Sequence, residues 1–159
     1  MAKRGFNLDV GQPPLLTDGF FLPAKHVLHV TGPAIQGPLT KKDMLSLSRA
    51  YADTLSAAVE ANLSSVALCC LSTGVFAFPA DKAASIALQT TRQFIEDHPN
   101  ALKTVIFCVF RDSDHELYLE RFPAVFPLAS NISVAKRSLL AASKVLVVGK
   151  WAVPSLSHE

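Results

Sequence analysis

The chain carries little charge and has no long apolar run, and the absence of these two features argues against several classes of protein. Charged residues make up 18% of its 159 residues, and 15 Lys and Arg against 13 Asp and Glu leave a formal net charge of +2. So small an excess, with no stripe of basic residues, argues against a nucleic-acid partner. The apolar stretches are broken by Ser, Thr, Gly or Pro well short of the ~20 residues that a bilayer span requires, so no membrane segment is expected.

Cysteine is scarce, and the first residues do not resemble a leader. Cys69, Cys70 and Cys108 all lie in apolar runs, and an odd number in such places predicts buried free thiols in a reducing compartment. The N-terminus, MAKRGFNLDV, is basic, but no apolar segment follows it. We therefore expect no signal peptide and a cytoplasmic protein.

Patterns typical of metal sites and of nucleophilic catalysis are also lacking. The histidines are scattered along the sequence: His26, His29, His98, His115 and His158. No H-x-x-x-H or Cys-x-x-Cys spacing occurs, and His26 and His29, three residues apart in a predicted strand, face opposite sides of it. Ser72 is not part of a G-x-S-x-G elbow. No metal site and no cofactor are expected, and no catalytic residue is assigned.

Strand-length apolar runs alternate with amphipathic helical patterns. Half of the residues are hydrophobic, which indicates a folded domain. Strands are predicted in LPAKHVLHVTGP, SVALCCLS, TVIFCVF and KVLVVG. Helices are predicted from a Thr40 cap, aided by Asp43, to Asn62; from about Asp81 to His98; in SDHELYLERF, capped by Asp112 or Ser113; and in SVAKRSLLAAS. In the first of these helices, Tyr51 falls on the apolar stripe. This order predicts an α/β sandwich with a mainly parallel sheet.

Ligands of such sheets bind beyond the carboxyl ends of the strands, where two loops are predicted, at residues 72–79 and 110–115. In the first, Gly74 permits a positive φ and a close approach of a ligand to the backbone. Successive main-chain N–H groups before a helix form an anion site. The turn contains no lysine, which favours a diphosphate held by backbone amides over a transferable phosphate. A purely steric role of the Ser-Thr-Gly turn is the alternative.

Two long stretches carry a family resemblance. CCLSTGVFAFPADKAASIALQTTRQFI, followed by KTVIFCVFRDSDHELYLERF, resembles the carboxyl-terminal half of a macrodomain, and LPAKHVLHVTGP resembles the strand before it. The resemblance covers about residues 17–125 and implies a three-layer α/β/α sandwich that binds ADP-ribose. The double cysteine before Ser72 and the segment GPLTKKD are most similar to the branch encoded near sirtuins, which includes zinc-dependent hydrolases that remove ADP-ribose from modified proteins.

The resemblance also implies roles for individual residues. One loop is expected to cradle the diphosphate of ADP-ribose: Ser72, Thr73, Gly74, Val75 and Phe76. Phe76 is also expected to line the distal ribose, and Phe110 and Asp112 to lie on the adenosine side. The alternative for Phe110 is a core aromatic at a strand end. The implied partner is ADP-ribose or an ADP-ribosylated protein, and the implied activity is that of a protein ADP-ribosyl hydrolase.

A complete macrodomain has a long amino-terminal half before the LPAK strand, which in the zinc branch carries the Cys and His ligands and the catalytic residues. Here about 20 residues precede that strand, and the only candidates among them are Asn7, Asp9 and Asp18, whose surroundings match none of the family's early motifs. We therefore expect a truncated mixed sheet with an exposed edge that favours association, including homo-oligomers. The alternative function is that of a catalytically inactive, truncated macrodomain acting as a binding or dimerisation module.

Three segments are expected: an irregular arm (1–22), a macrodomain-like core (23–126) and a helix–strand tail (127–159). The tail resembles the opening of a sirtuin domain. However, Gly149-Lys150-Trp151-Ala152 stands where a glycine-rich turn should follow. A macrodomain–sirtuin fusion shortened at both ends would account for arm and tail together.

Overall fold

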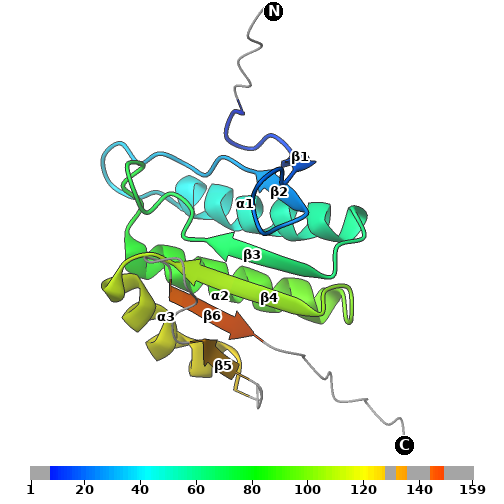
Figure 1. Ribbon diagram of the computed structural model, residues 1–159. Coiled ribbons are helices and arrows are strands. Elements are labelled where there is room, and N and C mark those ends of the chain that lie inside the picture. Colours follow the sequence, from blue (N-terminus) through cyan, green and yellow to red (C-terminus); the bar gives the residue numbers. More distant parts are fainter. Residues whose placement is uncertain (1–7, 128–131, 136–143, 149–159) are drawn as a thin grey trace, which may run out of the picture.

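Strands and helices alternate through most of the chain in the computed structural model, which describes residues 8–127, 132–135 and 144–148 (Figure 1). In chain order the elements are β1 (Leu15–Asp18), β2 (His26–His29), α1 (Lys41–Glu60), β3 (Ser65–Cys69), α2 (Ala80–Asp97), β4 (Thr104–Val109), α3 (Asp112–Val125), β5 (Ile132–Ala135) and β6 (Lys144–Val148). The predicted α/β class is confirmed.

The strands form a two-stranded and a four-stranded sheet. β1 pairs antiparallel with β2, and the larger sheet has the order β3-β4-β6-β5. Within it β3 and β4 are parallel, whereas β6 is antiparallel to both β4 and β5. The sheet is therefore mixed, as predicted, but among the described strands its parallel part is confined to one pair. The reason is that β5 and β6 follow each other closely and form an antiparallel pair at the edge.

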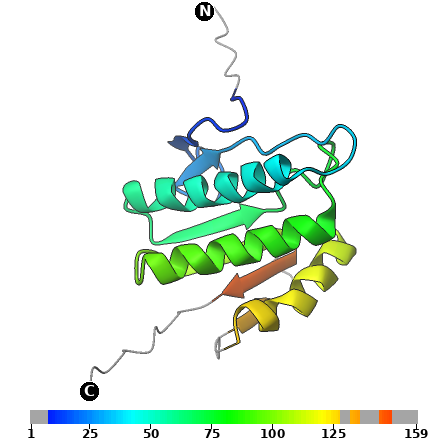
Figure 2. The same ribbon diagram turned by 180° about the vertical axis from the view of Figure 1, so that it is seen from behind.

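The helices cover one face of the larger sheet. Figure 1 shows α1 and α2 behind β3 and β4, and Figure 2 shows them in front when the molecule is turned round. Alternate residues of β4, Val105, Phe107 and Val109, are buried against this layer, and the ring of Phe107 lies 5.4 Å from that of Tyr118 in α3. On the other face, side chains of β3 such as Ala67 are exposed. The described residues thus supply one helical layer of the two expected.

The first predicted helix begins as expected. The backbone N–H of Asp43 donates to Oγ1 of Thr40 at 3.2 Å, and the N–H of Thr40 donates to Oδ2 of Asp43 at 2.9 Å, which completes a capping box. The helix ends at Glu60, and Asn62 adopts a left-handed φ of 55°, which fits the predicted stop. For α3 the cap prediction was wrong, because the N-cap is Arg111 rather than Asp112 or Ser113.

The arm and the tail differ from the predictions. Leu15–Asp18 of the arm forms β1, so this segment is not irregular throughout; its four residues are too few to show a clear period. Ile132–Ala135 forms β5, where SVAKRSLLAAS predicts the start of a helix, because pairing with β6 outweighs helical propensity there. Residues 136–143 and 149–152 lie outside the described part. The strand predicted in KVLVVG is confirmed as β6.

The cysteines of the described part are free thiols, as predicted, but they are not all buried. Cys69 is exposed, and Cys70 and Cys108 are half-buried. Cys69 and Cys108 lie in register on the parallel strands β3 and β4. None of the described helices has the length and apolar character needed to cross a bilayer.

Candidate functional site

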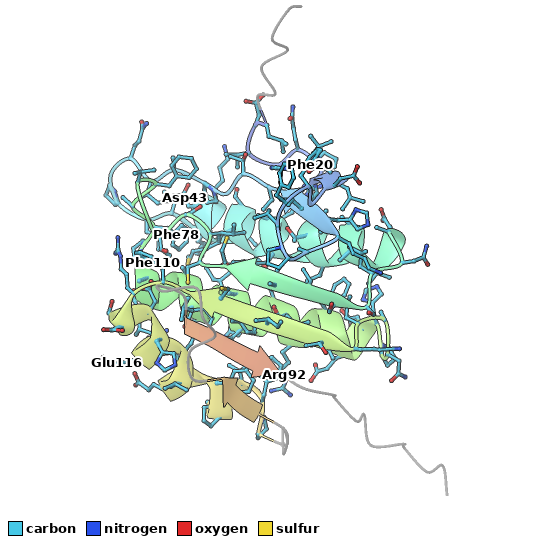
Figure 3. All side chains as sticks on the ribbon, in the orientation of Figure 1. Phe20, Asp43, Phe78, Arg92, Phe110 and Glu116 are labelled. Atoms are coloured by element: carbon cyan, nitrogen blue, oxygen red, sulfur yellow. The ribbon has the colours of Figure 1, made fainter. Side chains whose placement is uncertain are left out.

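The loops that follow β3 and β4 leave the sheet at the same edge. Cys69 and Cys108 are paired in parallel register, so Leu71 and Phe110 each lie two residues beyond that pair. Figure 3 places Phe78 and Phe110 at this edge, and Phe20 in the turn between β1 and β2. The structure therefore brings together the two loops that the sequence analysis selected.

Tyr51 of α1 holds the start of the first loop. Its hydroxyl donates to the carbonyl oxygen of Cys69 at 2.9 Å and accepts from the N–H of Leu71 at 3.0 Å. The side chain is fully buried, and burial raises the pKa of Tyr51 above its ordinary value, so the hydroxyl stays protonated. Sequence reasoning treated Tyr51 as a position on an apolar stripe. The missed signal is its hydroxyl, which needs a partner when it is buried.

The rest of the loop closes on itself by backbone hydrogen bonds. The N–H of Phe78 donates to the carbonyl of Ser72 at 2.9 Å, and the N–H of Ala77 donates to that of Gly74 at 3.0 Å. Ser72 and Ala77 adopt left-handed φ angles of 64° and 53°, whereas Gly74 is not among the residues with positive φ. The conformational reason given for Gly74 was therefore wrong. What Gly74 supplies is room, because a Cβ placed there meets no atom within 4 Å.

The segment after β2 packs against this loop. A Cβ built on Gly32 would lie 2.2 Å from Oγ of Ser72, so only glycine fits there without a shift. The hydroxyl of Ser72 is buried and has no hydrogen-bond partner among the described residues. Farther along, the N–H of Ile35 donates to the carbonyl of Phe76 at 2.8 Å. The sequence analysis included Gly32 only as part of the strand predicted in LPAKHVLHVTGP.

Between these anchors, a row of backbone donors is left without partners. The N–H groups of residues 72–76 make no hydrogen bond to any described residue. The side chain of Val75 is 97% exposed, and α2 begins a few residues later, at Ala80, after an N-cap that has no side-chain hydrogen bond. Unpaired N–H groups close to a helix N-terminus are the arrangement that binds anions.

A cavity of about 830 Å³ adjoins the loop. It is lined by residues 8–10 of the arm, by parts of β1 and β2, and by Leu71 and Phe76. Thr17 and His29, whose Oγ1 and Nε2 atoms lie 2.9 Å apart, also line it. This volume suits a small-molecule site of nucleotide size. The sequence analysis named Asp9 of the arm as a candidate but did not place the arm beside this loop, because the pairing of β1 with β2 could not be foreseen.

Only some of the other site residues named in the sequence analysis line this cavity. Among the described residues, Asp9 is the only acidic one in the cavity lining, whereas Asp18 lies 3.9 Å from Nδ1 of His26 and is not part of that lining. Asn7 lies outside the described residues. Phe110 is 69% exposed, so it is not a core aromatic. Neither Phe110 nor Asp112, which begins α3, lines this cavity.

The thiols beneath the loop are not suited to nucleophilic attack or metal binding at neutral pH. Burial, with a smaller contribution from Asp114, raises the pKa of Cys70 to about 12, and burial also raises the pKa of Cys69. Among residues 8–127 and the two described strands that follow, no three His, Cys, Asp or Glu side chains gather in a group that could hold a metal ion. The described residues therefore do not fit the zinc of the resembled branch.

Comparison with known proteins identifies close relatives. The Macro domain family model matches residues 5–87. The ADP-ribose glycohydrolase MACROD1 of Rattus norvegicus is 40% identical over 123 residues, which is 77% of this chain and 47% of the relative. The Protein-ADP-ribose hydrolase of Staphylococcus aureus (strain MSSA476) is 42% identical over 123 residues, which is 77% of this chain and 46% of the relative.

The solved structures that superpose on this chain are also macrodomains. The macro domain of ganglioside induced differentiation associated protein 2 superposes with a TM-score of 0.68 at 32% identity, over 72% of this chain and 57% of that one. The Trypanosoma brucei macrodomain in complex with ADP-ribose gives 0.63 at 36% identity, over 69% and 44%. This chain spans about half the length of the curated relatives that it matches. It belongs to the Macro domain family.

Proposed function

We propose that this protein binds ADP-ribose and that the loop of residues 72–76 holds its diphosphate. The observation that carries the proposal is the row of unpaired N–H groups in this loop beside the open space at Gly74. Neutral donors on a backbone held at both ends can bind a diphosphate without a lysine. A macrodomain of the same fold has been solved with ADP-ribose, which supports this choice of anion.

The positions of the neighbouring residues suggest how the ligand would lie. Phe76 belongs both to the loop and to the cavity lining, so the distal ribose would extend from the diphosphate toward the cavity. Phe110 and Asp112 follow β4, which Figure 1 shows on the opposite side of β3 from β2. The exposed ring of Phe110 would pack on the adenosine.

A melting experiment tests the binding proposal. ADP-ribose should raise the melting temperature, because a ligand at about 100 times its Kd stabilises the native state by about 2.7 kcal/mol. ADP should act similarly and AMP much less. Gly74→Glu should abolish the shift, since the open space lets the protein fold but the new carboxylate would repel the diphosphate.

A matched charge control is available at the far end of the sheet. Lys103 immediately precedes β4, so Lys103→Gln makes the protein more negative by the same single charge as Gly74→Glu without approaching the loop. This variant should keep the ADP-ribose shift. A melting temperature of the unaltered protein that does not move at millimolar ADP-ribose would refute the proposal.

Removal of ADP-ribose from modified proteins is the second candidate function. The curated relatives are named as ADP-ribose hydrolases, and Asp9 is the acidic residue that lines the cavity beside Phe76. Its carboxylate could activate a water molecule for attack on the distal ribose. A mono-ADP-ribosylated protein should therefore lose its label in the presence of this protein, and Asp9→Asn should slow that loss while ADP-ribose binding persists. Binding without turnover would favour the alternative of a catalytically inactive binding module.

Membership of the sirtuin-linked branch, truncation of the amino-terminal half and a cytoplasmic location stay predictions. The first rests on Cys69 and Cys70 before the loop and on the segment GPLTKKD. If turnover is observed, its loss with a chelator and its recovery with zinc would support the zinc branch.

A further inference from the structure

The first turn of α2 is fastened by α3, which packs beside it (Figure 2). The N-cap residue of α2, Pro79, makes no side-chain hydrogen bond to the helix. Instead, Nη1 of the half-buried Arg121 in α3 donates both to the carbonyl oxygen of Asp81 and to Oγ of Ser85. Oγ of Ser85 in turn donates to the carbonyl of Asp81 at 3.1 Å, so hydrogen bonds link all three residues.

This turn follows the proposed diphosphate loop directly. The N–H of Phe78 closes the loop on the carbonyl of Ser72 at 2.9 Å. Only Pro79, whose ring restricts its φ angle, separates Phe78 from Ala80, where α2 begins. Through so short and stiff a connection, a rotation of the first turn would also turn the backbone of residues 72–76. The direction of their N–H groups matters, because hydrogen bonds to a phosphate oxygen weaken when the donor is misaligned.

The same face of α3 also lies against the start of the loop. Asp114 and Tyr118 precede Arg121 at helical spacing and are both buried. The ring of Tyr118 lies 5.4 Å from that of Phe107 in β4. Burial and, to a smaller extent, the charge of Asp114 raise the pKa of Cys70, the residue that follows β3. α3 therefore lies close to both ends of the loop.

We propose that Arg121 is a positioning residue of the diphosphate site, which holds the first turn of α2 against α3 and so keeps the N–H groups of residues 72–76 directed at the ligand. This inference rests on the proposed function. Arg121 does not line the cavity beside Phe76, so it acts through Asp81 and Ser85. α3 begins two residues after Phe110. One helix thereby sets the position of the diphosphate loop relative to the adenosine side.

Arg92 offers a matched control, because it joins the same two helices at their other end. Its Nη1 donates to the carbonyl of Val125, the last residue of α3, at 2.8 Å, and its Nε donates to Glu96 at 2.8 Å. Figure 3 shows Arg92 well away from Phe110. Arg92→Met and Arg121→Met each remove a guanidinium that bridges the helices and one positive charge. Only the second variant loosens the turn beside the loop.

Calorimetric titration of the full chain with ADP-ribose tests the positioning role. Arg121→Met should weaken binding about tenfold, whereas Arg92→Met should weaken it less than about twofold. Arg121→Lys keeps a charged donor on a long side chain and should bind within about threefold of the unaltered protein. The loss in Arg121→Met should be the same at ~0.05 and ~0.5 M salt, because salt screens an attraction by charge but does not redirect a backbone donor.

Hydrogen exchange without nucleotide measures the turn itself. The N–H of Ala83 donates to the carbonyl of Pro79 at 2.9 Å, so residues 83–85 carry the first amides that are bonded within α2. In Arg121→Met these amides should exchange at least about fivefold faster than in the unaltered protein, because the turn opens more often. In Arg92→Met their exchange should not change.

The contrary outcomes are distinct. If the unaltered protein does not bind ADP-ribose, the proposed function fails, and the positioning role fails with it. If the unaltered protein binds and Arg121→Met binds equally well, or Arg92→Met binds equally weakly, the positioning role alone is overturned. A loss that disappears at high salt would mean that Arg121 only attracts the ligand by its charge. Unchanged exchange of residues 83–85, or a lysine variant as weak as Arg121→Met, would overturn the hydrogen bonds as the cause.

Discussion

The loops after β3 and β4 begin at the same edge of the sheet, yet they are built differently. After β3, the chain makes a long excursion that Tyr51 holds at its start and that backbone bonds from Phe78 and Ile35 hold farther on. After β4, only Phe110 and Arg111 separate the strand from α3. The long loop therefore has spare backbone N–H groups to offer, whereas the short one offers a side chain.

This difference suggests that the two loops have different roles in one site, with the first binding the diphosphate and the second contacting the base. Anchored backbone amides keep their positions without a ligand, so binding a diphosphate there costs little ordering. An exposed aromatic ring can pack on a base, but it does little for the stability of the protein. Substitutions that loosen the first loop should therefore affect folding and binding together, and substitutions in the second should affect binding alone.

The largest effect is expected from Tyr51→Phe. It leaves the N–H of Leu71 and the carbonyl of Cys69 without the hydroxyl, and buried groups that lose their partners cost about 2–3 kcal/mol in total. Urea denaturation should show this loss, and the ADP-ribose melting shift should shrink. Leu45→Ala, an exposed position of the same helix, is the control and should change the unfolding free energy by less than about 0.5 kcal/mol. Equal stability of Tyr51→Phe and the unaltered protein would remove Tyr51 as the anchor.

Gly32→Ala should have the next largest effect. The added Cβ would lie 2.2 Å from Oγ of Ser72, so the serine side chain must turn away, and a side chain held off its preferred rotamer costs about 1 kcal/mol. Ser72→Ala removes the unpartnered hydroxyl and should relieve most of that cost in the double variant. The double-mutant cycle, measured by urea denaturation, would contradict the contact if Gly32→Ala cost the same in both backgrounds.

Alkaline pH should destabilise the protein through the groups beneath the first loop. Burial raises the pKa of Tyr51, and it raises that of Cys70 to about 12 from an unfolded value of 9.0. Because the unfolded chain ionises first, the contribution to stability is complete below about pH 9 and is lost as the pH rises from there to about 12. The urea concentration at the midpoint of unfolding should fall between pH 7 and 11. In the Cys70→Ala variant this midpoint should fall less steeply with pH. If the midpoint fell equally steeply with pH in both proteins, Cys70 would not contribute to the loss of stability.

Local patterns and long-range pairing contributed unequally to what could be predicted from the sequence. The capping box of Thr40 and Asp43 involves neighbours in the chain, and the runs of β3 and β4 are apolar enough to identify alone. β1 could not be foreseen, because it is stabilised by pairing with β2. The sequence of β5 predicts a helix, and only its pairing with β6 makes it a strand. The same limit applies to the site: the loop was found from its residues, whereas Tyr51 acts through the fold.

The smallest effect on stability is expected from Phe110→Ala, and it separates the two loops most cleanly. The ring is 69% exposed, so its loss should change the unfolding free energy by less than about 0.5 kcal/mol. If the ring packs on adenine, the affinity for ADP-ribose should nevertheless fall about tenfold, since one such contact contributes about 1–3 kcal/mol. Calorimetric titration would measure the affinities of both proteins for ADP-ribose and for ribose 5-phosphate. The second ligand lacks adenine, so an equal loss for both ligands would show that Phe110 shapes the diphosphate loop instead.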